Sequence, residues 1–269
     1  MKKSFGQNLL VDTKYLNLSK EIIEAYPKSD VIEIGSGSGN LTKILSKKFK
    51  RVYACELEKD ILKSLKAIIK NDNLKNVEII EGNFLDLDLT KFNDFHIAGN
   101  IPYHITSQII IKLLGEIGSP SASLKETKNI YLMVQKEVAE RLCATPHTKD
   151  YSPLTLLAQF YTIPKLLFIV PKKSFHPIPK VDSAFIELKP KDKFPEVKDL
   201  KLLKKLIRTS FQQRRKKILN SMEEIIPKEE LNIILQKLNI SPNLRPENLS
   251  LEDFINISDS WEGTHLDRM

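Results

Sequence analysis

Four consecutive residues, Asn100-Ile101-Pro102-Tyr103, carry the side chains best suited to chemistry in this sequence. An asparagine side chain offers a carbonyl acceptor and an amide donor at one point. Proline fixes the backbone angle φ, and tyrosine supplies a flat face on which a heterocycle can stack. These groups suit a grip on the exocyclic amino group of a planar base, so all four are candidate catalytic residues. An ordinary turn closed by Asn and Pro is the alternative.

The elements expected around this stretch would place it at the edge of a sheet. The apolar run Phe95–Gly99 predicts a strand, and His104–Leu114 predicts a helix. A strand that leads directly into a helix puts the residues between them at the carboxyl end of the strand. Open α/β sheets bind their ligands at that edge.

The same alternation of strand and helix patterns runs through the first 190 residues and predicts an α/β fold with a doubly wound parallel sheet. The expected strands are Asp30–Ile34, Arg51–Cys55, Val77–Glu81, Phe95–Gly99 and Lys128–Val134, with a closing pair at Lys165–Pro171 and Ala184–Lys189. The expected helices are Thr13–Ala25, Leu41–Phe49, Lys59–Ile69, His104–Leu114, Gln135–Leu142 and Leu154–Tyr161.

A glycine-rich turn, Gly35–Asn40, follows the first of these strands. A strand, a glycine turn and a helix suit the polar part of a nucleotide or nucleoside, which can meet backbone amides at the helix start. A dinucleotide fingerprint requires a glycine three places after Gly37, and that position is Asn40, so a pyrophosphate cofactor is disfavoured. Gly35 and Gly37 are candidate cofactor-binding residues.

The next two strands also end in side chains that could hold a nucleoside. Glu56 at the tip of the second strand can accept hydrogen bonds from both ribose hydroxyls, although it could instead cap the following helix. Asn83 could bond an adenine edge while Phe84 packs against the ring. S-adenosylmethionine would account for this set, with its methionine portion at the glycine turn.

The Asn100 stretch would then face the methyl group of that cofactor. The Asn100 side chain and the Ile101 carbonyl could accept the N–H bonds of an adenine N6 and favour a more pyramidal nitrogen. Tyr103 would stack on the base and stabilise the positive charge that develops during transfer. Phe175 could hold a base that has left its stack.

Composition limits the class of protein. The chain has 269 residues, 28% charged and 41% hydrophobic, as in a soluble globular protein. Cys55 and Cys143 have no metal-type neighbours, and the five histidines show no ligand spacing, so neither a disulfide framework nor a metal site is expected. No signal peptide or membrane span is apparent. We expect a cytoplasmic monomer.

Positive charge is concentrated near the C-terminal end. The charged, proline-bracketed segment Lys189–Pro195 predicts a boundary between a domain at 1–190 and a helical domain at 191–269. Lys201–Lys217 contains eight basic residues and no acidic one. The charge of this segment therefore equals the net charge of the whole chain, +8. A solvated helix face usually interleaves acids, so a surface that binds nucleic-acid phosphates is favoured. The candidate RNA-binding residues are Lys204, Arg208, Arg214, Arg215, Lys216 and Lys217.

Six motifs occur in an order that resembles the ribosomal RNA adenine dimethyltransferase family, specifically its bacterial small-subunit branch. These motifs are Lys3–Leu10, Val31–Gly39, Gly99–Tyr103, Val134–Ala139, Phe175–Ser183 and Phe211–Lys217. The resemblance implies a class I methyltransferase fold with a small all-helical C-terminal domain and no membrane association. It also implies transfer of two methyl groups to each of two adjacent adenosines in the loop of the 3′-terminal hairpin of 16S rRNA, within the immature 30S subunit.

The resemblance also implies a cofactor site. Carried over by position, that site comprises Asn8, Leu10, Gly35, Glu56, Asn83 and Asn100. The family usually has Asp at the position of Asn83, and Asn keeps an acceptor but lacks the charge. Weaker cofactor binding is therefore one expectation.

Two alternatives stay open. The resistance methyltransferases, which modify one adenosine of 23S rRNA, share the first half of these motifs. The basic Arg214–Lys217 run and Leu249–Phe254 favour the small-subunit branch. A largely non-catalytic RNA-binding assembly factor is the second alternative, and the presence of Asn100 and Tyr103 argues against it.

Overall fold

The computed structural model describes residues 8–261, which fall into two compact units. Within that range, unit 1 holds residues 8–115, 121–139 and 162–190, and unit 2 holds residues 116–120, 140–161 and 191–261. The boundary expected near residue 190 is one junction between the units. Two earlier segments also group with the C-terminal helices, although their sequence reads as part of the α/β alternation.

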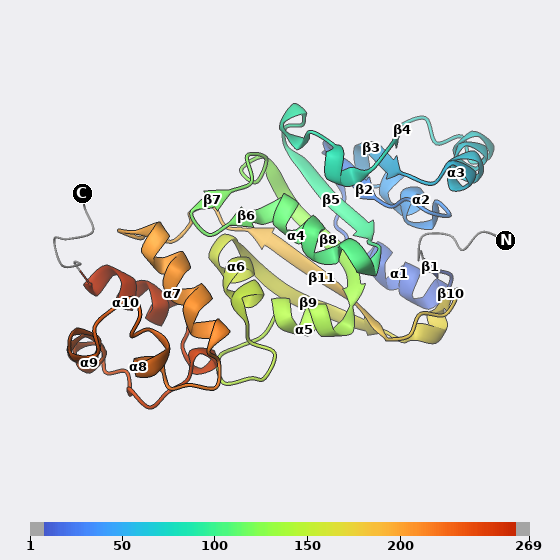
Figure 1. The fold of residues 1–269 in the computed structure, drawn as a ribbon. Coiled ribbons are helices and arrows are strands. Elements are labelled where there is room, and N and C mark those ends of the chain that lie inside the picture. Colours follow the sequence, from blue (N-terminus) through green and yellow to red (C-terminus); the bar gives the residue numbers. More distant parts are fainter. Residues whose placement is uncertain (1–7, 262–269) are drawn as a thin grey trace. The chain divides into compact units, whose positions relative to one another are not determined.

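Unit 1 is built on a seven-stranded mixed sheet with the order β4-β3-β2-β5-β8-β11-β9 (Figure 1). The first five strands in this order pair in parallel, and β11 runs antiparallel to both of its neighbours. The α/β expectation is confirmed, including the closing pair of strands. The strands are β2 Tyr26–Ile34, β3 Phe49–Glu56, β4 Val77–Glu81, β5 Phe95–Asn100, β8 Thr127–Gln135, β9 Thr162–Val170 and β11 Ser183–Pro190.

The helices between these strands bury apolar stripes. In α3 (Lys59–Asn71), Leu62 and Leu65 are buried while the lysines around them are exposed. Asp12 caps α1 by accepting the Lys14 N–H, and this helix ends three residues before the expected Ala25 because the chain is already extended at Ile23. Besides α3, the helices that begin in unit 1 are α1 Thr13–Ile22, α2 Asn40–Ser46, α4 Thr106–Leu114 and α5 Lys136–Leu142.

The order of the strands reverses between β2 and β5, which are neighbours in the sheet. β3 and β4 lie beyond β2, and β8 lies beyond β5. Gly99 pairs with Ile34, and a Cβ on Gly99 would lie 2.7 Å from the Ile34 carbonyl oxygen. Only glycine allows this approach, so the carboxyl ends of β2 and β5 meet closely at the point where such sheets bind ligands.

Two short strand pairs have no clear sequence signal. β1 (Leu9–Leu10) pairs antiparallel with β10 (Phe175–His176), so the chain already forms an ordered strand at Leu9 (Figure 1). A second pair joins β6 (Gly115–Glu116) and β7 (Ser119–Pro120). Residues this few carry no periodicity, and only their tertiary partners define them as strands.

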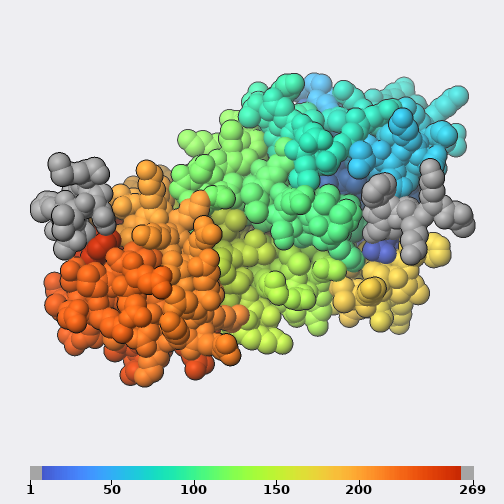
Figure 2. Space-filling model, viewed as in Figure 1, coloured from blue at the N-terminus to red at the C-terminus, as the bar shows by residue number. Residues whose placement is uncertain are grey.

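Unit 2 is helical, and its C-terminal part forms one continuous orange and red body in Figure 2. The expected helical run Lys201–Lys217 breaks at Gln213, so its last basic residues lie in a turn between α7 and α8. Ser250 and Asp253 form a capping box that starts α10. The helices are α6 Pro153–Tyr161, α7 Leu200–Gln212, α8 Ile218–Ser221, α9 Lys228–Lys237 and α10 Leu251–Ser260.

Two features of composition have simple structural counterparts. Cys55 and Cys143 are both free thiols, and burial raises the pKa of each to about 11. Within residues 8–261, none of the helices is both long and apolar enough to cross a bilayer.

Candidate functional site

The predicted catalytic stretch lies at the carboxyl end of β5. The Ile101 N–H donates to the Met133 carbonyl at 3.2 Å, which continues the β5–β8 pairing past the strand end, and the Ile101 side chain is buried. Pro102 has φ −61° and leads into a 3-10 turn at Tyr103–Ile105. The stretch is therefore a rigid turn that is anchored to the sheet.

The Asn100 side chain is oriented by the N-terminal segment. Its Nδ2 donates to the Asn8 carbonyl oxygen at 2.7 Å. No other residue that the structure describes occupies its Oδ1, which remains available as an acceptor. This bond uses one of the two amide hydrogens and fixes the orientation of the amide, and therefore the direction of its oxygen.

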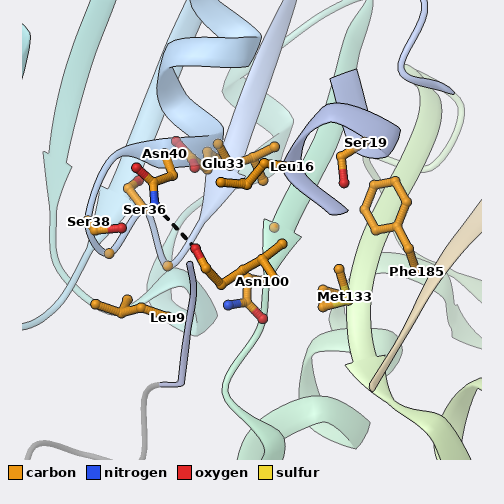
Figure 3. A pocket seen from close by; sticks show the side chains of 15 residues that line it. Leu9, Leu16, Ser19, Glu33, Ser36, Ser38, Asn40, Asn100, Met133 and Phe185 are labelled. Atoms are coloured by element: carbon orange, nitrogen blue, oxygen red, sulfur yellow. Dashed lines mark hydrogen bonds between the residues drawn. The ribbon is translucent and has the colours of Figure 1, made fainter. Parts of the chain in front are cut away.

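The segment that supplies Asn8 is held down at several points. Asn40 Nδ2 donates to the Leu10 carbonyl at 3.2 Å, as the dashed line in Figure 3 shows. The N–H groups of Val11 and Asp12 both donate to the Ser174 carbonyl. The Leu10 side chain is buried. Both N-terminal residues implied by the resemblance, Asn8 and Leu10, therefore lie beside the glycine turn and Asn100.

The glycine turn adopts backbone angles that favour glycine. Gly35 has φ +67° and Gly37 has φ +52°, and a Cβ on Gly37 would lie 2.7 Å from Leu9 Cδ2. The Gly35 and Ser36 N–H groups donate to the Cys55 carbonyl at the end of β3. Leu9 and the end of β3 therefore contact the turn from two sides. Because Gly35 has no side chain, the cavity wall at this residue is formed by backbone alone.

Glu56 binds backbone on both sides of the sheet edge. Its Oε1 accepts the N–H groups of Leu57 and Glu58 just before α3, and its Oε2 accepts the Gly37 N–H at 3.0 Å. The carboxylate thus caps the turn before a helix and also ties the glycine turn to β3. It lines a cavity as well, so the capping role does not exclude a ligand role.

Asn83 and Phe84 lie across that cavity from the glycine turn. Asn83 Oδ1 accepts the Leu85 N–H at 3.1 Å, so its amide hydrogens are the part directed elsewhere. The Phe84 ring is 4% exposed, and Lys112 Nζ lies 5.8 Å from its centre. The pair forms a flat, half-polar wall.

Three cavities adjoin along this sheet edge, and Gly35 lines all of them. The first, of about 520 Å³, is lined by Glu56, Asn83 and Phe84. The second, of about 490 Å³, lies between the Leu9–Leu10 strand and the glycine turn (Figure 3). The third, of about 280 Å³, is lined by Asn8 and by the whole Asn100 to Tyr103 stretch. The arrangement suits an elongated ligand beside a separate small pocket.

Glu33 in the second cavity was not among the predicted site residues. Its side chain is 1% exposed, its Oε2 accepts the Thr42 hydroxyl at 2.6 Å, and its Oε1 has no hydrogen-bond partner in the described chain. Burial raises the pKa of Glu33 to about 8. A glutamate inside an otherwise apolar strand was the available signal, because buried acids are rare unless they are paired.

Phe175 requires a correction. Its ring is 1% exposed and packs in the core of unit 1 with Leu10, Val170 and Phe185. A ring enclosed in this way has no free face for a base, so the structure does not support a stacking role. The apolar side chains that this loop presents to solvent are Ile178, at 64% exposed, and Val181, at 43% exposed.

The predicted RNA-binding residues separate into two groups in unit 2. Lys204 forms an ion pair with Glu116, and Lys217 Nζ donates to Asn243 Oδ1. Arg214 donates to the Lys149 carbonyl at 2.6 Å and lies 3.6 Å from the Glu247 carboxylate, so it holds unit 2 together. The remaining three, Arg208, Arg215 and Lys216, are exposed.

Four cations of α7 share one helix face. Lys201, Lys204, Lys205 and Arg208 are all exposed, while Leu202, Leu203, Leu206 and Ile207 on the other side are buried. Their spacing of i, i+3, i+4 and i+7 aligns them as a stripe. We call these four residues the α7 stripe.

No cluster of three or more His, Cys, Asp or Glu side chains that could hold a metal ion occurs within residues 8–261.

Comparisons with known proteins agree with this arrangement. A family model described as ribosomal RNA adenine dimethylase matches residues 1–262. The ribosomal RNA small subunit methyltransferase A of Caldanaerobacter subterraneus subsp. tengcongensis is 40% identical over 271 residues, covering 96% of each chain.

Two solved structures are similar over most of the chain. A dimethyladenosine transferase from Plasmodium falciparum has a TM-score of 0.75 at 27% identity, covering 93% of this chain and 95% of that one. The 23S rRNA methyltransferase ErmE has a TM-score of 0.77 at 24% identity, covering 94% of this chain and 99% of that one. The second likeness bears on the fold alone.

The buried Glu33 predicts an unusual pH dependence of stability. Between pH 6.5 and 8 the unfolded chain has this carboxyl ionised, whereas the folded chain keeps it protonated, so the folded state loses stability as pH rises. We expect Glu33 to contribute a loss of about 1–2 kcal/mol over this window. Glu33→Gln, which cannot ionise, should remove that slope.

Thermal melts of wild type and Glu33→Gln at pH 6.5, 7.2 and 8 measure the effect. The Tm of the variant should exceed that of wild type by an amount that grows as the pH rises. The buried His96, whose pKa burial lowers to about 4, titrates below this window. Glu78→Gln, at an exposed position of β4, is the control. Parallel Tm curves for wild type and Glu33→Gln would contradict the prediction.

Proposed function

This chain belongs to the ribosomal RNA adenine dimethylase family, and from that premise we propose that it dimethylates N6 of two adjacent adenosines in 16S rRNA. The proposed methyl donor is S-adenosylmethionine, and the proposed substrate is the loop of the 3′-terminal hairpin in an immature small subunit. The observation that carries the proposal is that Gly35 lines all three cavities and that Asn100 lines the smallest of them.

The first cavity fits the nucleoside end of the cofactor. The Glu56 carboxylate, which three backbone amides hold in place, would accept the ribose hydroxyls. Asn83 would donate an amide hydrogen to a ring nitrogen of adenine, since its oxygen already serves Leu85. Phe84 would pack against the ring plane. The aspartate that the family usually has at this position would accept a hydrogen bond, whereas Asn83 would donate one.

The second cavity fits the amino-acid end. The unpartnered Glu33 Oε1 in this cavity suits an ammonium group, because a buried carboxyl gains most from a partner of opposite charge. Gly35 and Gly37 keep the path between the two cavities clear of side chains. When bound, S-adenosylmethionine would supply a methyl group that is already activated toward a nucleophile.

Asn100 and Ile101 would align the target amine in the third cavity. Asn100 Oδ1 accepts one N6–H, because the bond from its Nδ2 to Asn8 fixes the orientation of the amide. The Ile101 carbonyl accepts the other. Two acceptors on one amine draw the nitrogen lone pair toward the methyl donor, and accurate alignment supplies most of the expected rate gain. Proton transfer to a side chain before attack is not required.

Tyr103 would provide the stacking surface for the target base. Its ring is half-buried and lines the third cavity beside Asn100. Burial raises the pKa of its hydroxyl, which keeps the ring neutral at physiological pH. A neutral, electron-rich ring against the base stabilises the positive charge that appears on the base during transfer.

Unit 2 would contribute phosphate contacts. The α7 stripe presents Lys201, Lys205 and Arg208 on one exposed helix face beside Lys204, which is also exposed but paired with Glu116, and Arg215 and Lys216 lie in the turn that follows. Cations in such a row follow the spacing of phosphates and bind RNA of any sequence. Arg214 is excluded from this role because its guanidinium is engaged within unit 2.

Replacing Glu56 should weaken cofactor binding. Glu56→Gln keeps the shape of the side chain and removes its charge, so we expect a loss of about 1.5–3 kcal/mol in affinity for S-adenosylmethionine. Isothermal titration calorimetry measures it. Glu81→Gln is the matched control, because Glu81 pairs with Glu56 in the β3–β4 register but does not line the cavity. Equal dissociation constants for Glu56→Gln and wild type would remove Glu56 from the ribose site.

Replacing Asn100 should slow methyl transfer more than it weakens binding. Asn100→Ala removes the N6 acceptor and also the bond to Asn8, and a displacement of about 1 Å can lower a rate on the order of a hundredfold. The rate is measured as single-turnover methyl transfer to small subunits that lack the modification. 23S rRNA is added as the competing substrate. An Asn100→Ala rate equal to that of wild type, at equal Tm, would show that the stretch is an ordinary turn.

Neutralising the α7 stripe should weaken RNA binding without affecting the cofactor. Lys201→Ala, Lys205→Ala and Arg208→Ala together should reduce the slope of log K against log salt by about 2–3, since each phosphate contact contributes roughly 0.7–0.9. The control replaces Lys63, Lys70 and Lys75, which are exposed in and just after α3. The same salt slope in both triple variants would show that the stripe is only solvated.

A further inference from the structure

The hydroxyl groups of Tyr103 and Ser183 lie 2.5 Å apart and share a hydrogen bond, although 80 residues separate them in the chain. Ser183 is the first residue of β11 and is fully buried. Nothing in the sequence connects these two positions, and the proposed chemistry of Tyr103 uses only its ring.

Ser183 is a rigid partner. It is paired with Gln135 of β8 on one side and with Val170 of β9 on the other, so its backbone is held by ladders on both edges of β11. A buried serine in the interior of a sheet has little freedom to follow a moving tyrosine. The position of its Oγ is therefore set by the sheet and not by the site.

The Tyr103 ring is fixed at both of its ends by this contact. Its backbone follows Pro102 at the end of β5, and its hydroxyl is bonded to β11. A tyrosine side chain rotates about two bonds, and a hydrogen bond at its tip fixes the first rotation once the backbone is fixed. The hydroxyl oxygen lies on the axis of the second rotation, so the bond sets the position of the ring beside the third cavity before any base arrives.

We propose that Ser183 is a positioning residue for methyl transfer, which holds the Tyr103 ring in the place where a target base stacks with its amine beside Asn100. This inference rests on the proposed function. Ser183 touches neither substrate nor cofactor in this scheme, since it lines none of the three cavities. It acts through the tyrosine hydroxyl, so that hydroxyl becomes important to the rate although it takes no part in the chemistry.

A double-mutant cycle tests the pair. Ser183→Ala and Tyr103→Phe each break the bond while retaining the sheet and the ring, and each should lower the single-turnover rate about 5- to 20-fold at saturating cofactor and RNA. The double variant should be no slower than the slower single variant, because both substitutions remove the same constraint. The dissociation constant for S-adenosylmethionine should not change in any of the three.

A second readout separates ring position from a general loss of structure. RNA with 2-aminopurine at the target adenosine reports stacking by its fluorescence, and Ser183→Ala should reduce the quenching seen with wild type. Ser123→Ala is the matched control: Ser123 is also buried in unit 1 and its hydroxyl also meets another serine hydroxyl, at 3.2 Å. It should match wild type in rate and quenching.

The outcomes are distinct. A wild-type rate in Ser183→Ala, or losses that multiply in the double variant, would overturn the positioning role. If Ser183→Ala does not fold, Tyr103→Phe decides alone, and a wild-type rate in that variant overturns the proposal. Failure of the proposed function looks different, because wild type itself would then transfer no methyl group to small subunits.

Discussion

The hydrogen bond from Asn100 Nδ2 to the Asn8 carbonyl is the interaction on which the site depends. An asparagine amide can turn either its oxygen or its nitrogen toward a ligand, and the two choices recognise opposite partners. Because the nitrogen is engaged by backbone, the oxygen is presented. The same bond ties the N-terminal segment to the end of β5, while Asn40 ties it to the glycine turn through the Leu10 carbonyl, so both edges of the second cavity are joined to this segment.

Much of this arrangement could be predicted from local sequence. The strand before Asn100, the turn at Gly35 and the acid at Glu56 each sit at a boundary between an apolar run and a helical pattern, and such boundaries are visible in one dimension. The parallel sheet follows from their repetition. The carboxyl edge of the sheet then brings together residues that are far apart in the chain, so candidate residues from several strands can be predicted to lie close together.

The rest depended on tertiary contacts. The β1–β10 pair is too short to show a period, and the Ser183 partner of Tyr103 is defined only once β11 is placed. Phe175 was misjudged because an aromatic residue in a proline-stiffened loop gives no indication of which way its ring points; here it points into the core. In unit 2, counting charges located the basic residues but could not distinguish Arg214, which is engaged internally, from the exposed α7 stripe.

The β1–β10 pairing has a consequence for synthesis of the chain. Asp12 is bonded to Ser174 across 162 residues, and Tyr103 is bonded to Ser183. A ribosome releases the N-terminal segment first, yet that segment has no strand partner until residue 176 has emerged. The glycine turn and β5 can fold much earlier, since their contacts are nearer in the chain. The third cavity, which Asn8, Leu9 and Tyr103 help to line, is thus among the last parts to be completed, and a partly made chain would lack it.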